Sequence, residues 1–221
     1  MDAADNAILA KIDYTLLAQN STPAQIRQLC AEAARFGFAS VCVPTCYVET
    51  ALAALAELGS AVPVCAVAGF PFGYNTTECK LYETRQALDQ GAEEVDMVIN
   101  VGRLLAGDED YVYNEIRLLK QETGGKVLKV IIEACLLDER RKIIACGLVT
   151  RAGADFIKTS TGFSTGGATV EDIRLLRANV GPGVKVKAAG GIRSAEFARA
   201  LVAAGADRLG MSAAVKAFGL A

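Results

Sequence analysis

The feature that most constrains the fold of this chain is a repeated pattern: a helix-like segment ends in glycine and a short apolar segment follows. The pattern occurs around Gly37, Gly91, Gly153 and Gly205. Glycine there fits the left-handed position that ends a helix, and a strand can begin a few residues later. The intervals between these glycines, 54, 62 and 52 residues, are roughly twice the length of one strand–helix unit. Each interval is therefore expected to contain a second strand.

Apolar segments of strand length do lie inside each interval, and another lies near the start of the chain. The predicted strands are residues 11–15, 40–43, 62–67, 95–99, 127–132, 156–158, 184–188 and 208–210. Helices are predicted between them, at residues 23–36, 45–58, 76–90, 104–122, 138–152, 169–178, 194–204 and 213–218. A short leading helix is predicted at residues 3–10. Pro23 suits a first helical turn, and Ser194 is expected to cap the helix that follows it.

Strict alternation of strands and helices indicates an α/β fold with a parallel sheet. Eight such units favour a closed (β/α)8 TIM barrel, with residues 1–221 forming a single domain. The alternative is an open doubly wound sheet, which usually carries a glycine-rich loop after its first strand. Here the glycine-rich turns follow the third, sixth and seventh predicted strands instead, so the barrel is preferred.

Composition excludes several kinds of site. The chain has no histidine, which removes His-based zinc sites and Ser-His or Cys-His nucleophiles. Its seven cysteines are irregularly spaced without a C-x-x-C pair, so we expect reduced thiols and no metal site. A net charge of −2 without a long basic run argues against nucleic acid or a membrane surface as a partner. Because no apolar run resembles a signal peptide or a membrane span, a cytoplasmic protein is expected.

Charged residues inside the predicted strands give the first indication of a site. Helices cover the outside of a barrel, so a polar strand residue should face its interior. Side chains alternate along each strand, and this alternation predicts that five charged residues face the interior: Asp96, Lys129, Lys158, Lys185 and Lys187. Two alternatives stay open: Lys185 fits a residue at a strand start that reaches solvent, and Asp96 alone fits a buried ion pair as well as catalysis.

Lys158 and Lys187 lie near the carboxyl ends of adjacent predicted strands, the face that carries the active site in this fold. A lysine with its ordinary pKa of about 10.4 is almost fully protonated at pH 7, whereas attack on a carbonyl needs a free amine. A second ammonium about 6 Å away adds roughly 2.8 kcal/mol of repulsion at an effective dielectric of about 20. We therefore expect Lys158 to be a nucleophile, Lys187 its charged neighbour, and Asp96 with water the proton-transfer group.

A second set of residues suggests an anion site. Gly190 and Gly191 lie between the seventh predicted strand and a helix, where exposed amides at a helix N-terminus bind anions. Arg193 can clamp the same anion. Gly210 and Ser212 form a similar turn after the eighth strand. Because the loops after strands seven and eight are the usual phosphate site of TIM barrels, we predict a phosphate here.

Together these motifs resemble those of the deoxyribose-phosphate aldolases, a class I aldolase family with the barrel fold. The resemblance covers most of the chain and lies in residues 11–17, 67–71, 94–100, 129–133, 156–163 and 187–193. It implies reversible cleavage of 2-deoxy-D-ribose 5-phosphate to acetaldehyde and D-glyceraldehyde 3-phosphate, as in deoxyribose catabolism. It also implies that no metal or organic cofactor is needed.

The resemblance further implies roles for individual residues. Lys158 would form the Schiff base with acetaldehyde, Lys187 would perturb its pKa, and Asp96 would take part in the proton relay. Lys129 would help to stabilise the carbinolamine, and Asp13 would contact a substrate hydroxyl. The residues implied at the phosphate end are Thr161, Gly162, Gly190, Gly191, Arg193, Gly210 and Ser212.

Two other functions stay open: a different Schiff-base aldolase, such as a transaldolase-like enzyme with a ketose phosphate donor, and a catalytically silent phosphosugar-binding barrel. The intact lysine pair argues against the silent barrel. Three positions depart from the family's pattern and bear on substrate preference, namely Tyr14, Phe163 and Ala213. The expected partners are small phosphosugars and aldehydes, and a homo-oligomer is compatible with the sequence.

Overall fold

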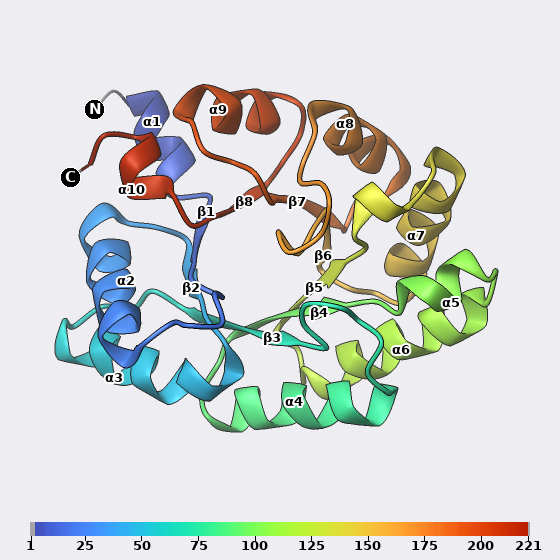
Figure 1. The fold of residues 1–221 in the computed structure, drawn as a ribbon, viewed down its shortest axis with the longest axis horizontal. Coiled ribbons are helices and arrows are strands. Elements are labelled where there is room, and N and C mark those ends of the chain that lie inside the picture. The colour runs from blue at the N-terminus through green and yellow to red at the C-terminus, as the bar shows by residue number, and fades with distance from the viewer. Residues whose placement is uncertain (1–2, 221) are drawn as a thin grey trace.

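The strands of this protein close into a parallel barrel (Figure 1). The structure, a computed structural model, describes residues 3–220. β1 pairs with both β2 and β8, so the sheet has no free edge, the predicted (β/α)8 barrel is confirmed and the open sheet is excluded. The strands are β1 (Ile12–Thr15), β2 (Ser40–Cys42), β3 (Val64–Ala68), β4 (Glu94–Val98), β5 (Val127–Ile131), β6 (Phe156–Lys158), β7 (Lys185–Ala189) and β8 (Arg208–Met211).

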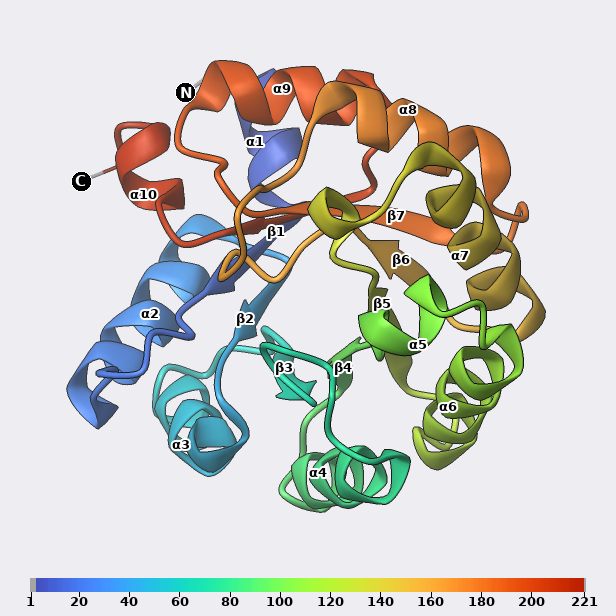
Figure 2. The same ribbon diagram turned by 45° about the vertical axis from the view of Figure 1, so that its right-hand side comes forward.

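Helices surround the strands on the outside of the barrel (Figures 1 and 2). They are α1 (Ala3–Leu9), α2 (Pro23–Phe36), α3 (Val48–Glu57), α4 (Thr77–Asp89), α5 (Val101–Leu105), α6 (Glu109–Glu122), α7 (Glu139–Arg151), α8 (Val170–Asn179), α9 (Ala195–Ala203) and α10 (Ala214–Ala217). Short 3-10 turns, η1 (Thr45–Tyr47) and η2 (Ala134–Leu136), precede α3 and α7. The predicted leading helix is present as α1. No helix within residues 3–220 is long and apolar enough to cross a membrane.

Local side-chain contacts explain where several helices begin. Thr22 accepts a hydrogen bond from the backbone of Gln25, whose side chain accepts one from the backbone of Thr22, and Pro23 occupies the first turn of α2. Ser194 caps α9 as expected, accepting a hydrogen bond from the amide of Phe197 at 3.1 Å. These caps satisfy amides that an unmodified helix end leaves unpaired.

The predicted long helix at residues 104–122 is wrong, because two helices occupy this region. α5 ends before Gly107, which has a left-handed φ of 82° that favours glycine. Asp108 then starts α6 by accepting a hydrogen bond from the amide of Tyr111 at 3.3 Å. The turn chemistry of Gly107 and Asp108 therefore overrides the continuous helical pattern.

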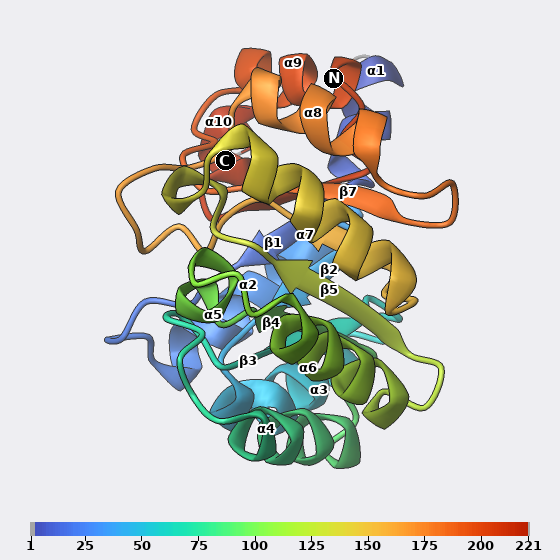
Figure 3. The same ribbon diagram turned by 90° about the vertical axis from the view of Figure 1, so that its right-hand side faces the viewer.

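The two ends of the barrel carry different loops. The segments that follow the strands, including residues 16–22 and 159–169, gather on the left of Figure 3, and those that precede the strands lie on the right. Nearly every strand side chain is buried, because the outward ones pack under the helices. Several inward-facing ones are charged, and these form the centre of the candidate site.

Candidate active site

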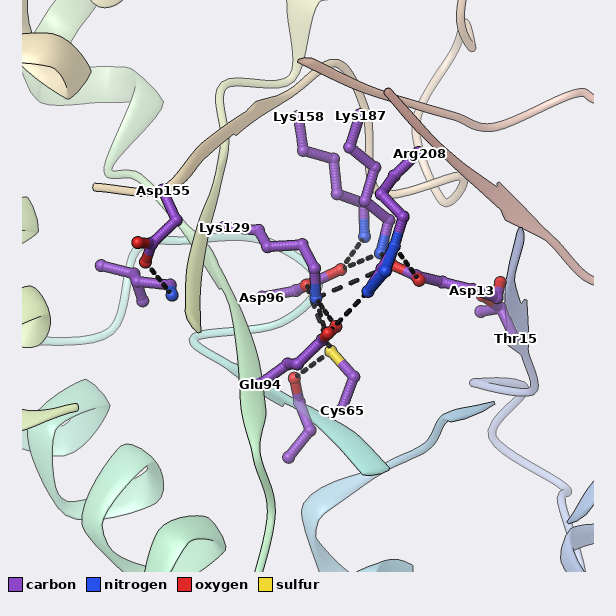
Figure 4. A network of polar contacts seen from close by, with 12 residues as sticks. Asp13, Thr15, Cys65, Glu94, Asp96, Lys129, Asp155, Lys158, Lys187 and Arg208 are labelled. Carbon is purple, nitrogen blue, oxygen red and sulfur yellow. Dashed lines mark hydrogen bonds and ion pairs between the residues drawn. The ribbon is translucent and has the colours of Figure 1, made fainter. Parts of the chain in front are cut away.

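A cluster of charged side chains fills the interior of the barrel (Figure 4). The predicted inward orientation holds for Asp96, Lys129, Lys158 and Lys187, all of which are buried. Lys185 is different: it is exposed, with its Nζ 5.6 Å from the centre of the Phe156 ring. The cluster is made by Asp13, Glu94, Asp96, Lys129, Lys158, Lys187 and Arg208, which come from β1, β4, β5, β6, β7 and β8.

Asp96 lies where the three lysines meet. Its Oδ2 accepts hydrogen bonds from Lys158 Nζ at 2.6 Å and from Lys187 Nζ at 2.7 Å. Its Oδ1 accepts one from Lys129 Nζ at 2.9 Å. Burial by itself would raise the pKa of Asp96, but attraction to Lys129, Lys158 and Lys187 outweighs burial and holds this pKa well below its usual value. Asp96 is therefore an ionised carboxylate.

Lys129 and Lys187 each face two carboxylates at close range. Lys187 Nζ lies 2.5 Å from Asp13 Oδ2 in addition to Asp96, and Lys129 Nζ lies 2.6 Å from Glu94 Oε2 in addition to Asp96. Burial would lower the pKa of each lysine, but the neighbouring carboxylates raise the pKa of both above the ordinary lysine value. Both side chains are therefore ammonium groups.

A cavity of about 260 Å³ opens above Lys158 at the end of the barrel where the strands terminate. Among the described residues that line it, Lys158 is the only lysine. All of the residues predicted for the phosphate end also line this cavity: Thr161, Gly162, Gly190, Gly191, Arg193, Gly210 and Ser212. The structure thus brings the predicted nucleophile and the predicted phosphate ligands to one space.

The remaining predicted site residues lie below the cavity. Asp96, Lys129 and Lys187 are not part of its lining and reach it through Lys158. Asp13, predicted to contact a substrate hydroxyl, is fully buried and lies between Lys187 and Arg208. Burial would raise the pKa of Asp13, but attraction to Lys187, Lys129 and Arg208 lowers it to about 2. The structure therefore does not bring Asp13 to the substrate space.

The model of the DeoC/LacD family of aldolases matches residues 7–220. This chain belongs to that family. A deoxyribose-phosphate aldolase of Geobacillus sp. (strain WCH70) is 54% identical over 214 residues, covering 96% of this chain and 94% of that protein. The enzyme of the same name from Streptococcus pneumoniae serotype 19F (strain G54) is 53% identical over 204 residues, 92% of each chain.

Solved structures of this aldolase family have the same fold. A putative deoxyribose-phosphate aldolase from Coccidioides immitis is 40% identical, with a TM-score of 0.93 over 97% of this chain and 85% of that one. The deoxyribose phosphate aldolase from Aeropyrum pernix, described as a unique tetrameric structure, is 35% identical, with a TM-score of 0.88 over 99% of this chain and 97% of that one. The resemblance noted from the sequence is confirmed.

Two of the three departures from the aldolase pattern lie outside the cavity. Tyr14 points toward α2, where its hydroxyl donates to Glu32 at 2.6 Å; burial and this carboxylate raise the pKa of Tyr14. Ala213 is not among the lining residues. Phe163 does line the cavity, is partly exposed, and meets the ring of Phe70 edge-on at 5.4 Å. Phe163 is therefore the one of these three residues that lines the cavity.

Sequence reasoning about this aldolase missed two members of the charged cluster. Arg208 donates from Nε to Asp13 at 2.8 Å and from Nη2 to Glu94 at 2.6 Å, which bridges β1 and β4. The available signal was parity, because Glu94 and Asp96 share a strand face. Glu94 lies one residue before the predicted strand 95–99 and Arg208 is the first residue of the predicted strand 208–210, so neither lies inside a predicted strand.

One group of side chains in the described part of the chain has the spacing of metal ligands. Atoms of Cys42, Cys65 and Asp96 lie within 4.8 Å of one another. The same Asp96 carboxylate is held by Lys158 and by the ammonium groups of Lys129 and Lys187, and a metal ion there would meet strong repulsion. These three side chains therefore fit a hydrogen-bonding network better than a metal site.

Proposed function

We propose that this protein is a deoxyribose-phosphate aldolase that acts through a Schiff base on Lys158. It would cleave 2-deoxy-D-ribose 5-phosphate reversibly to acetaldehyde and D-glyceraldehyde 3-phosphate. The observation that carries the proposal is that Lys158 alone of the clustered lysines lines the cavity, within hydrogen-bond distance of a buried carboxylate that is also held by two further ammonium groups. Relatives that share more than half of the sequence carry the same name.

The ion pairs of the cluster distinguish Lys158 from the other two lysines. Four cationic side chains, Lys129, Lys158, Lys187 and Arg208, face three carboxylates, Asp13, Glu94 and Asp96. One proton too many is therefore present when all seven are ionised, and uncompensated charge is costly in a buried cluster. Lys129 pairs with three carboxylates and Lys187 with two, whereas Lys158 has Asp96 alone and lines the cavity. Lys158 is therefore the lysine of the cluster with the fewest carboxylate partners and the one exposed to substrate, which suits it to act as the nucleophile.

The reaction follows from this amine. The nitrogen of Lys158 attacks the C1 aldehyde carbon of the open-chain sugar to form a carbinolamine, which loses water to give a protonated imine. Removal of the proton from the C3 hydroxyl breaks the C2–C3 bond, and the electron pair moves into the imine to form an enamine. D-Glyceraldehyde 3-phosphate leaves; protonation of the enamine at C2 and hydrolysis then release acetaldehyde and Lys158.

Asp96 is suited to support these steps by position and charge. Its carboxylate lies next to the Lys158 nitrogen, so it stabilises the positive imine and orients water for the proton relay. Lys129 is separated from the cavity by Asp96, so we assign it to holding the Asp96 carboxylate in place. This differs from the direct contact with the carbinolamine that the resemblance implied.

The other end of the cavity fits the phosphate. Gly190 and Gly191 have left-handed φ values of 87° and 76° and lie in the turn before α9. Amides in such a turn and at a helix N-terminus attract anions. Arg193 lines the cavity without an acidic partner among the described residues. We assign the phosphate to this end, with Lys158 at the base of the cavity.

Other predictions from the sequence remain proposals: one domain over residues 1–221, a cytoplasmic location, a reaction without cofactors, and no nucleic-acid partner. A homo-oligomer is supported by the name of the Aeropyrum pernix relative, which describes a tetramer. Its relevance to this chain would be tested by measuring the mass of the protein in solution.

Turnover of defined substrates tests the function. The protein should release acetaldehyde from 2-deoxy-D-ribose 5-phosphate, and a ketose phosphate should be inert as donor. Lys158→Leu should lower kcat by more than about a thousandfold, as loss of a covalent nucleophile does in other enzymes, while calorimetry still detects phosphosugar binding. Turnover by Lys158→Leu would refute the nucleophile. If the unchanged protein cleaved only the ketose phosphate, the transaldolase-like alternative would be favoured. If it bound phosphosugars without cleaving any, the silent barrel would be favoured.

A further inference from the structure

Glu133 has a backbone conformation that side chains rarely adopt. It lies two residues after the end of β5, and among residues 3–220 it is the one non-glycine residue with a positive φ (φ 50°, ψ 62°). A side chain at such an angle crowds its own backbone, and residues held there persist when the surrounding structure requires them. Glu133 is also buried, 4% exposed. Its surroundings therefore indicate what the strain achieves.

Both carboxylate oxygens of Glu133 bind one residue of the loop after β6. Oε1 accepts a hydrogen bond from the amide of Thr161 at 3.2 Å, and Oε2 accepts one from the Thr161 hydroxyl at 2.5 Å. The hydroxyl oxygen of Thr161 in turn accepts a hydrogen bond from the amide of Phe163 at 3.1 Å. A carboxylate at the end of β5 thus fixes residues 161–163, which begin three residues after Lys158.

Glu133 reaches this loop from the side away from substrate. Thr161, Gly162 and Phe163 line the catalytic cavity, but Glu133 does not. Glu133 lines instead a separate space of about 90 Å³ on the other side of Thr161 and Phe163. The Thr161 hydroxyl and the amides of Thr161 and Phe163 are all bound within this network, so among residues 161–163 the amide of Gly162 is the one left for the cavity. The predicted role of Thr161 as a substrate ligand is therefore not supported for its side chain.

This loop packs directly against the turn after β7, which also lines the cavity. A Cβ atom added at Gly190 would lie 3.5 Å from the Cα of Gly162 and 3.4 Å from the Cβ of Ser160. Gly162 itself has a left-handed φ of 86°. Movement of residues 161–163 would therefore shift Gly162 relative to Gly190, and both glycines line the end of the cavity to which the phosphate is assigned.

We propose that Glu133 is a positioning residue that holds residues 161–163 so that the Gly162 turn faces the phosphate of the substrate. This inference rests on the proposed function, because it needs a phosphosugar in the cavity. It assigns Glu133 no contact with substrate and no part in Schiff-base formation. Binding of the phosphorylated end therefore depends on Glu133, whereas attack by Lys158 on a small aldehyde does not.

Glu133→Gly and Thr161→Val test the proposal together. Glycine relieves the backbone strain but removes both hydrogen bonds, and valine removes the hydroxyl with little change in shape. Each variant should raise the KM for 2-deoxy-D-ribose 5-phosphate about tenfold, the loss expected for one or two hydrogen bonds. Borohydride trapping of acetaldehyde on Lys158 should stay within about twofold of the unchanged protein, because acetaldehyde carries no phosphate and Lys158 is untouched.

Two further variants sharpen the result. The double variant Glu133→Gly with Thr161→Val should raise KM by less than the product of the two single effects, because both changes remove the bond between Glu133 and the Thr161 hydroxyl. Glu133→Gln, which keeps an acceptor for the Thr161 amide, should restore part of the affinity. Thr165→Val is the matched control, since Thr165 is exposed on the same loop and does not line the cavity.

An unchanged KM in folded Glu133→Gly or Thr161→Val would overturn the proposal. A parallel fall in trapping and affinity would also overturn it, because a general structural role would then explain both. Absence of trapping in the unchanged protein is a separate outcome, which would refute the proposed function. Thermal unfolding of each variant identifies any that fail to fold, and Thr161→Val then remains the deciding variant.

Discussion

At the scale of single residues, the site depends on which buried cations pair with Asp96 and which pair with Asp13. Asp96 accepts from Lys129, Lys158 and Lys187, and Asp13 pairs with Lys187 and Arg208. Strand parity predicted that the lysines and Asp96 face inward. It could not predict that Lys187 is shared by two carboxylates, since the distances depend on rotamers and strand register. Lys187 therefore acts as a charged neighbour of Lys158 with its own counter-ions.

The ion pairs of Asp13 predict a loss of stability in acid. Although burial opposes it, attraction to Lys187, Lys129 and Arg208 lowers the pKa of Asp13 from 3.8 to about 2. A carboxyl whose folded pKa is depressed contributes stability above its unfolded pKa and loses it as pH falls through the folded value. The free energy of unfolding in urea should therefore fall between about pH 4 and pH 2.

Asp13→Asn should flatten this dependence and lower stability at pH 7, since the asparagine cannot lose a proton. Asp110→Asn, on the exposed side of α6, is the control and should keep the acid dependence of the unchanged protein. Equal slopes for Asp13→Asn and the unchanged protein would contradict the assignment of this carboxylate.

At the scale of elements, a buried ion pair joins two helices to the cavity end of the barrel. Lys80 of α4 donates to the carbonyl oxygens of Gly73 at 2.7 Å and Val98 at 2.8 Å, and to Glu115 of α6 at 2.6 Å. Glu115 also accepts from the amide of Asn100 at 3.1 Å. Burial lowers the pKa of Lys80 and raises that of Glu115. The pair fixes the turn after β3 to the end of β4, the strand of Asp96.

Breaking this pair should be costly. Lys80→Met leaves the Glu115 carboxylate buried without its cation, and such changes typically destabilise a protein by about 3–5 kcal/mol. The free energy of unfolding in urea measures the effect. The exposed pair Arg27–Glu57, with 3.0 Å between the charged atoms, is the matched control. Arg27→Met should change stability by less than about 1 kcal/mol, and equal losses in the two variants would contradict the role given to Lys80.

At this scale the strands could be predicted from the sequence, whereas contacts between distant segments could not. Period and glycine spacing predicted the eight strands, because those signals are local. Lys80 was not singled out, since a lysine on a polar helix face normally points to solvent. Strand parity placed Glu133 on the same face as Lys129, but its strained backbone could not be predicted, because it is set by contacts with a loop 28 residues later in the chain. Contacts of this kind become visible only when distant segments are placed side by side.

At the scale of the whole molecule, barrel closure creates the site. Asp13 and Arg208 are 195 residues apart in sequence, yet they form a hydrogen-bonded ion pair because β8 closes on β1. The same closure brings the turns after β6, β7 and β8 around one cavity. The fold and the location of the cavity could be predicted, because active sites of TIM barrels lie at the strand ends. The exclusion of Asp13 and Lys129 from its lining could not, since that depends on depth within the barrel.

The central claim is that Lys158 is the amine that attacks the carbonyl. Incubation with acetaldehyde and sodium borohydride would reduce the imine to a stable ethylamine, and mass spectrometry of the digested protein would locate it. The structure predicts one ethyl group on the peptide that contains Lys158, because this lysine alone among the clustered ones lines the cavity. An ethyl group on Lys129 or Lys187 instead, or no modification in a protein that still cleaves the substrate, would contradict the claim.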